Sequence, residues 1–212
     1  MPITELIFPV WKTDPQSVAN LKQSEPQIFK HFSGLNGLEA GFRGSITEAN
    51  GAVVKPESLK TMLVLEWADV SSFHKFYPES SEFQALIQSL KPYVNAPAVP
   101  ELYESQSRSI SATSAAVTQM VKTTLGGETE HAWEQLEKTI GELAGDKPSF
   151  YYAKGILKDQ GTFLGMIGWK SLEEYEQVGK HVHVLEQVKK LNQEGAVESL
   201  VVQLADWVPF EM

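Results

Sequence analysis

The feature that most constrains the fold is a short unit that occurs twice: an apolar strand-like run that ends in Trp and leads into a helix-like segment. The first copy reads TMLVLEWADVSSFHKF, residues 61–76, and the second reads FLGMIGWKSLEEYEQV, residues 163–178. When Trp67 is set against Trp169, apolar residues recur at matching positions. This recurrence predicts a chain built from two copies of one supersecondary unit.

Each half reads in the order strand, helix, strand, strand, helix, strand. The expected strands cover residues 3–11, 38–47, 60–67 and 102–105 in the first half, and 117–124, 150–158, 162–170 and 197–206 in the second. The helix after the third strand is expected over about 70–93, broken or kinked at Pro78, and its counterpart over about 172–194. We therefore expect a first unit at 1–106, a Ser-rich linker at 107–116 and a second unit at 117–212.

The third strand of each half carries apolar residues on both faces. Leu63 and Leu65 point one way with Trp67, whereas Met62 and Val64 point the other way. Such a strand is buried on both sides. The two helices of one half can cover only one face of its sheet. The other face needs a cover as well, and the simplest candidate is the sheet of the other half, which predicts a closed or nearly closed barrel with the helices outside.

Composition excludes several classes of function. The chain has 212 residues, a formal net charge of −9 and no cysteine. The missing cysteines rule out disulfides, thiolate nucleophiles and cysteine-ligated metals. A protein that binds nucleic acid needs a basic face, and no basic run here exceeds two residues. There is also no apolar run long enough for a membrane span and no secretory signal pattern, so we expect a cytoplasmic protein with no membrane partner.

The order of elements and the repeated strand–Trp–helix motif resemble the dimeric α+β barrel superfamily. That superfamily includes antibiotic-biosynthesis monooxygenases (the ABM domain), stress-responsive A/B barrel proteins and small polyketide cyclases. The chain resembles two such units fused in tandem. The resemblance implies an α+β fold of two ferredoxin-like βαββαβ units, with their sheets packed face to face as a pseudo-dimeric barrel. Fold alone does not fix function.

The resemblance also implies two alternative functions. One is a cofactor-independent enzyme of secondary metabolism that removes a proton from a small hydrophobic, aromatic or polyketide-like molecule in the barrel cavity, as a monooxygenase or a cyclase does. The other is a non-catalytic small-molecule-binding or stress-associated barrel. No cofactor is expected in either case, because nucleotide-binding motifs are absent and neither half has the histidine that haem-degrading relatives use. A fused pair supplies its own barrel, so we expect a monomer or a dimer formed through outer surfaces.

Histidines are the first candidates for a catalytic base. His183 lies eight residues after Tyr175, and in catalytic relatives a histidine at about this distance points into the barrel cavity; the alternative is a histidine on the helix surface. His74 is three residues before Tyr77, so the pair offers a base and an oxyanion donor, although a helix flank is the simpler interpretation. A metal site is not expected, because His181 and His183 point to different sides of a helix.

Aromatic and acidic side chains on the strands are candidate ligand contacts. Tyr151 and Tyr152 are adjacent on a strand, so one of them points into the barrel. Glu66 interrupts an otherwise apolar strand, where it is either at an exposed end or an acid with a perturbed pKa in the cavity. The predicted ligand-binding residues are Trp67, Trp169, Tyr151, Tyr152, Tyr175 and Glu66. For the two tryptophans, a place in the core is the competing interpretation.

Overall fold

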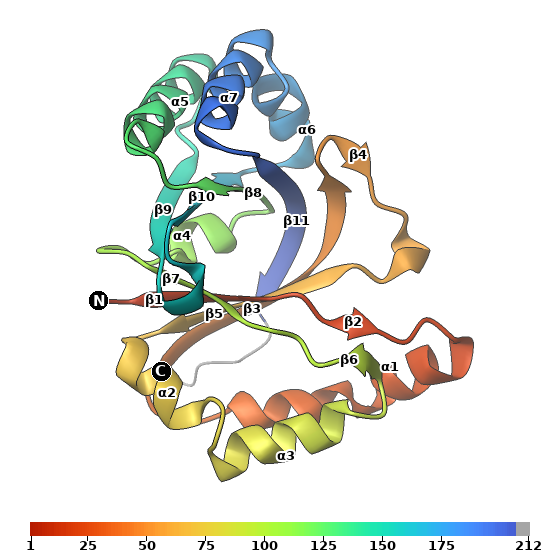
Figure 1. Cartoon of the computed structure of the whole chain (residues 1–212). Coiled ribbons are helices and arrows are strands. Elements are labelled where there is room, and N and C mark those ends of the chain that lie inside the picture. The colour runs from red at the N-terminus through yellow and green to blue at the C-terminus, as the bar shows by residue number, and fades with distance from the viewer. Residues whose placement is uncertain (207–212) are drawn as a thin grey trace.

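The structure, a computed structural model, describes residues 1–206 apart from the side chains of 192–194. Within these residues, eight strands close into one antiparallel barrel with helices outside (Figure 1). The barrel strands are β1 (Ile3–Ile7), β3 (Leu38–Ala49), β5 (Thr61–Trp67), β7 (Glu101–Glu104), β8 (Val117–Thr124), β9 (Ser149–Gly155), β10 (Thr162–Trp169) and β11 (Glu198–Asp206). The predicted α+β barrel is confirmed.

The strands follow the same spatial order in both halves. In the first half the order is β7-β1-β5-β3, and in the second it is β11-β8-β10-β9. The halves meet at two places, where β7 pairs with β9 and β3 pairs with β11. The β3–β11 ladder is the longer of the two and runs from Ala49↔Leu200 to Phe42↔Asp206. These two pairings remove the free edges that each half-sheet would otherwise expose.

Helices cover the outside of the barrel on opposite sides (Figure 1). The first half carries α1 (Pro15–Phe29), the 3₁₀ turn Lys30–Phe32, α2 (Val70–Phe76) and α3 (Ser81–Leu90), and the second carries α5 (Thr129–Leu143), α6 (Leu172–Glu174) and α7 (Val182–Glu194). Asp14 caps α1 by accepting from the Ser17 amide at 2.9 Å, and Pro15 occupies its first turn. A small ribbon of β2 (Val10–Trp11) and β6 (Val94–Ala96) lies beside α1 and α3.

Side chains alternate between the barrel interior and the helix layers. The interior is filled from both halves by a cluster that includes Leu6, Phe42, Met62, Val64, Met120, Leu164, Met166 and Val202. The opposite faces pack under the helices in two separate clusters, one for each half. The interior of the barrel is therefore a packed core, and the two cavities described below lie outside it, beside the helices.

The sequence pattern predicts one continuous helix over 172–194 that buries a stripe including Val182 and Leu185, and both predictions are wrong. After α6, the chain makes a π-helical turn at Tyr175–Gly179, and α7 begins anew with His181 as its N-cap. The break shifts the helical phase. Val182 and Leu185 are therefore exposed, whereas Val184 is buried.

The Ser-rich segment between the halves belongs to the core. Residues Ile110–Thr113 form the short helix α4, in which Ala112 and Thr113 are fully buried. The backbone of Ala112 approaches Gly168 so closely that a Cβ at Gly168 would meet it. The linker therefore packs against β10. The last six residues of the predicted second unit, 207–212, lie outside the described part.

A substitution of Gly165 on β10 tests the packing of the second half. A Cβ at this position would collide with the indole ring of Trp133 on α5. We expect Gly165→Ala to lower the free energy of unfolding by about 1–3 kcal/mol, because the ring is held in a packed core. Urea denaturation measures this change.

Gly141→Ala is the matched control. Gly141 lies within α5, and a Cβ there would meet no atom within 4 Å. This substitution should stabilise the protein by about 0.5–1 kcal/mol, because alanine favours a helix over glycine. Equal effects of the two substitutions would contradict the packing described here.

Candidate functional site

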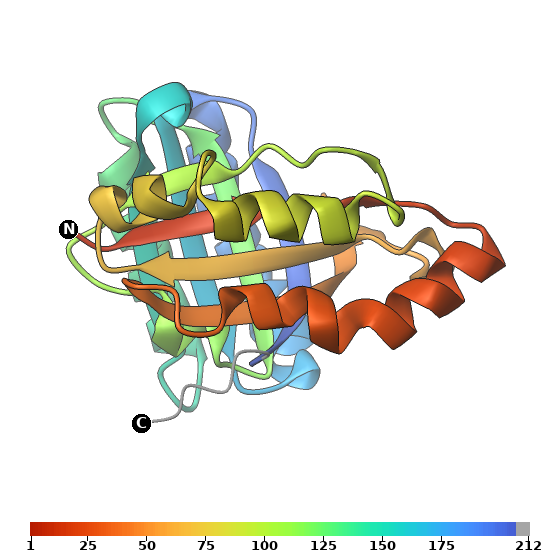
Figure 2. The ribbon, with the colours of Figure 1, turned by 90° about the horizontal axis from the view of Figure 1, so that it is seen from below.

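An apolar pocket of about 530 Å³ lies between the first half-sheet and its helices. Its floor is the helix-facing side of β1 and β5, and its walls come from α1, α3 and the β2–β6 ribbon. Figure 2 shows the backbone of α1 and α3 on this side of the sheet. The lining includes Trp11, Phe29, Phe32, Leu63, Tyr77, Phe83, Leu86, Ile87 and Leu90. A concave, mostly apolar pocket of this size suits a small aromatic molecule.

One carboxylate lies in this apolar lining. Glu5 occupies the middle of β1 and faces the helices, as its strand neighbours Ile3 and Ile7 do. The indole Nε1–H of Trp67 donates to Glu5 Oε2 at 2.7 Å. The bond fixes one carboxylate oxygen, and no other hydrogen bond to Glu5 is found among the described residues.

Burial raises the pKa of Glu5 to about 7, and the hydrogen bond from Trp67 lowers it by a smaller amount. Desolvation is the larger influence because the charged form loses its hydration inside the protein. A carboxyl group with this pKa exchanges a proton readily near neutral pH. It therefore has the property that a general base or general acid requires.

Tyr77 is the predicted catalytic residue that the structure places in this pocket. Its ring stacks on Phe73 with a centroid distance of 5.2 Å and meets the edge of Phe83 at 4.9 Å. Its hydroxyl has no hydrogen-bond partner in the described part of the chain. The hydroxyl can therefore donate to a ligand.

The second half has the same strand arrangement at the equivalent position but no buried carboxylate there. Relative to the tryptophan that ends each third strand, Glu5 corresponds to Gln119, because Trp67 pairs with Ile3 and Trp169 pairs with Val117. Leu63 corresponds to Gly165, over which the Trp133 ring lies. Large side chains thus fill the space that corresponds to the pocket.

A second buried carboxylate lies inside the barrel. Glu66 Oε1 accepts from Thr4 Oγ1 at 2.7 Å and from the hydroxyl of Ser109, and Thr4 shares a 2.6 Å hydrogen bond with Tyr151 OH. Burial raises the pKa of Glu66 to about 7, and the hydroxyl hydrogen bonds oppose this shift. Of the two alternatives that the sequence left open for Glu66, an exposed strand end and a buried acid with a perturbed pKa, the position of Glu66 agrees with the second. The acid is held among packed side chains and joins β1 and β5 to the linker and β9.

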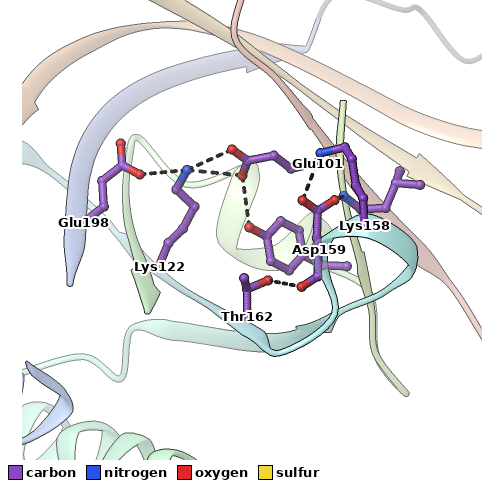
Figure 3. Close-up of polar contacts among 8 residues, drawn as sticks. Glu101, Lys122, Lys158, Asp159, Thr162 and Glu198 are labelled. Atoms are coloured by element: carbon purple, nitrogen blue, oxygen red, sulfur yellow. Dashed lines mark hydrogen bonds and ion pairs between the residues drawn. The ribbon is translucent and has the colours of Figure 1, made fainter. Parts of the chain in front are cut away.

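A third polar cluster joins the halves beside β7 (Figure 3). Lys122 Nζ lies 3.1 Å from Glu101 and 2.8 Å from Glu198, and it sits 4.8 Å from the Phe8 ring centroid. Tyr103 OH donates to Glu101 at 3.0 Å. The Lys122 ammonium group thus contacts two carboxylates and one aromatic ring of the protein itself. We therefore interpret this cluster as one that holds the two halves together.

The predicted histidines do not face a cavity. His183 lies on the outer surface of α7 with its side chain 64% exposed, and its ring is 3.4 Å from Glu186. The prediction that it points into the barrel is wrong because the helix restarts at His181 and its phase changes. His74 is exposed on α2, beside the ring of Phe73, and is not among the residues that line the pocket.

The remaining predicted ligand contacts divide between core and surface. Trp169 is fully buried against Tyr175, whose hydroxyl donates to Glu48 at 2.7 Å. Tyr152 is 38% exposed on the outward face of β9, and Tyr151 is the one that points into the barrel. Trp67 is also buried, and of the two tryptophans it is the one that contacts the pocket's acid.

Sequence reasoning missed Glu5, although the signal was present. Glu5 lies between Ile3 and Ile7 on the buried face of a predicted strand, as Glu66 lies between apolar neighbours on its own strand. A carboxylate in that position needs a partner or a function. Within residues 1–206 no group of three or more histidine, aspartate or glutamate side chains could hold a metal ion. No helix there is long and apolar enough to cross a membrane.

Comparisons with known proteins identify the fold. No protein-family model and no curated protein sequence matches the chain. An anthrone oxidase-like protein matches with a TM-score of 0.64 and 12% identity, over 97% of this chain and 93% of that one. A candidate monooxygenase from Fusobacterium nucleatum matches with a TM-score of 0.61 and 10% identity, over 99% and 98%. A variant chlorite dismutase from Candidatus Nitrospira defluvii has a TM-score of 0.58 and 10% identity, over 96% and 90%. The chain therefore has the α+β barrel fold of these proteins.

The buried carboxylates predict how stability depends on pH. Glu5 and Glu66 have a pKa of about 7 in the folded protein, against the ordinary glutamate pKa of 4.5. Between these values the folded state keeps protons that the unfolded state has released. The free energy of unfolding should therefore fall as pH rises from about 4.5 to 7 and then level off, by up to about 3 kcal/mol for each group. Urea denaturation across this range measures the change.

Glu66→Gln isolates one of the two groups. This amide can still accept from Thr4 and Ser109 but does not titrate, so we expect a shallower fall of stability between pH 4.5 and 7. Glu57→Gln is the control, because Glu57 is exposed and should leave the curve unchanged. An unchanged curve for Glu66→Gln would show that Glu66 is not the titrating group.

Proposed function

We propose that the protein is a cofactor-independent enzyme that acts on a small hydrophobic aromatic molecule, with Glu5 as the general base. The observation that carries this proposal is the single carboxylate on the floor of an apolar, aromatic pocket, with its pKa near 7. We also propose that the chain is a tandem pair of ferredoxin-like units. The equal strand order of the two halves supports this arrangement.

The pocket suits a planar substrate with one acidic proton. Phe32, Tyr77 and Phe83 offer aromatic faces, and Glu5 lies on the floor beneath them. Removal of a proton from a phenol or from a carbon next to a carbonyl gives an anion whose charge spreads over the oxygen. The free hydroxyl of Tyr77 is the proposed donor to that oxygen.

The proposed reaction is an oxygenation by molecular oxygen. Glu5 takes a proton from a CH₂ group activated by a carbonyl, and the resulting carbanion forms a C–O bond with O₂. Protonation gives a hydroperoxide, which loses water to leave a carbonyl group. One CH₂ and one O₂ thus become one C=O and one H₂O. The names of the anthrone oxidase-like and monooxygenase neighbours are consistent with this class of reaction.

The fused halves also bear on oligomeric state. Both edges of each half-sheet are paired within the one chain, so the barrel needs no second copy. We propose that the protein is a monomer in solution. Light scattering after size-exclusion chromatography tests this proposal.

Glu5→Gln tests the proposed base. The amide still accepts from Trp67 but cannot take a proton, so turnover of an anthrone or a similar activated phenol should fall by about 10²–10⁴-fold. The activity of the unchanged protein should rise with pH through about 7 as Glu5 ionises. Oxygen consumption and quinone absorbance provide the rate.

Glu66→Gln is the matched control, because Glu66 has a similarly raised pKa but lies inside the packed barrel. It should leave turnover nearly unchanged. Binding of the aromatic compound without turnover in the unchanged protein would instead favour the non-catalytic alternative. Equal activity of Glu5→Gln and the unchanged protein would remove Glu5 from the mechanism.

Trp67→Phe tests how the hydrogen bond from Trp67 affects the pKa of Glu5. Loss of the indole N–H removes the hydrogen bond that lowers the pKa of Glu5, so the pKa should rise further. The rising limb of the pH–rate profile should move to higher pH, while the rate well above that limb changes less. A lower rate with an unshifted limb would mean that Trp67 contributes only to packing.

A further inference from the structure

A second cavity, of about 910 Å³, lies on other faces of the same two helices. It is lined by α1, the 3₁₀ turn Lys30–Phe32, the loop after that turn, α2, and the start and end of α3. Figure 2 shows α1 and α3 side by side on this side of the molecule. We call this cavity the outer groove. Its lining has more polar side chains than that of the pocket that contains Glu5.

The outer groove has a buried apolar floor. Ile28 and Phe76 are 2% and 7% exposed, and the Phe76 ring packs against Phe32 at a centroid distance of 5.8 Å. At Tyr93 the groove is closed by a 2.7 Å hydrogen bond between Ser24 Oγ and Tyr93 OH, which joins α1 to the end of α3. The floor can therefore hold a small carbon skeleton.

The walls carry two exposed ammonium groups. Lys30 and Lys75 line the outer groove, and neither ammonium group makes an ion pair or hydrogen bond in the described part of the chain, although the charge of Lys75 lowers the pKa of Asp69. His31 lies beside them and is half-buried. The one carboxylate in the lining, Glu82, accepts from Ser81 Oγ at 3.0 Å. This local excess of positive charge contrasts with the net charge of −9 of the whole chain.

Helix dipoles alone do not explain this arrangement. A cation near the end of α1 or in the last turn of α2 is favoured by the partial negative charge at a helix C-terminus. That effect acts on each helix separately. The dipole effect does not explain why Lys30 and Lys75, which come from different elements, line the same cavity. Among the described lining residues, Glu82 is the one carboxylate.

We propose that the outer groove binds a small phosphorylated molecule with a short apolar or aromatic portion. Lys30 and Lys75 would hold the phosphate, because ammonium groups form charge-assisted hydrogen bonds to its oxygens. The hydroxyls of Ser33, Ser72 and Ser80 line the same groove and can donate. The carbon skeleton would lie on Ile28 and Phe76. This site is separate from the proposed catalytic pocket, whose ionised Glu5 would repel a phosphate.

Titration with phenyl phosphate tests the proposal. Phenyl phosphate carries both the anion and the ring, whereas inorganic phosphate lacks the ring and phenol lacks the charge. We expect saturable binding of phenyl phosphate, weaker binding of inorganic phosphate, and chemical-shift changes at the backbone amides of Gly34 and Asn36 in nuclear magnetic resonance spectra. Raising the ionic strength should weaken the binding, since the lysines are exposed.

Two double variants of equal charge provide the comparison. Lys30→Ala with Lys75→Ala should weaken phenyl phosphate binding by about tenfold or more, because both charge-assisted contacts are lost. Lys55→Ala with Lys60→Ala removes two exposed lysines that do not line the outer groove, and it should leave the affinity nearly unchanged. Thermal unfolding of each variant checks that the fold is intact.

Ile87→Trp separates the outer groove from the apolar pocket. Of these two cavities, Ile87 lines the apolar pocket and not the outer groove, so a larger side chain there should block turnover but leave phenyl phosphate binding intact. The absence of saturable binding, an equal loss in both double variants, or loss of binding in Ile87→Trp would each overturn the proposal. None of these results would bear on the role of Glu5.

Discussion

Two antiparallel strand pairs, β7 with β9 and β3 with β11, turn two half-sheets into one closed barrel. An open half-sheet of four strands would expose an unpaired edge on each side and an apolar face to water. Closure satisfies both edges through backbone hydrogen bonds and brings the two apolar faces together as one core. The free volume that remains lies under and between the helices, and this is where both proposed sites are found.

The two buried carboxylates differ in whether a substrate can reach them. Glu5 and Glu66 are raised to a similar pKa by the same cause, loss of hydration. Glu66 is enclosed in the packed barrel, where hydroxyls bond one of its oxygens and the other has no partner among the described residues, whereas Glu5 lines a cavity. A perturbed pKa therefore marks a functional residue only when a substrate can reach it.

The halves share a backbone plan and differ in how they use the space beneath the helices. In the first half, Leu63 leaves room beside Glu5. In the second half, Gly165 allows the Trp133 ring to lie directly on the sheet. A neutral Gln119 occupies the position of Glu5 there, which avoids burying a charge that has no function. The packing thus leaves room for a ligand in the first half, whereas side chains fill the equivalent space in the second half.

The sequence by itself determined the barrel. Apolar residues on both faces of the third strands, and the recurrence of Trp67 as Trp169, leave few other ways to bury this much surface. The sequence left open whether Glu66 is interior, and which of Tyr151 and Tyr152 points into the barrel. Tertiary structure alone decided the site. The phase of α7 depends on the break at His181, so a continuous helical pattern could not decide between a His183 that points into the barrel and one on the helix surface. The cavity beside Glu5 depends on whether a side chain from another element fills it, as Trp133 does in the second half. Local periodicity encodes which face of an element is buried, but free volume is a property of how distant side chains fit together.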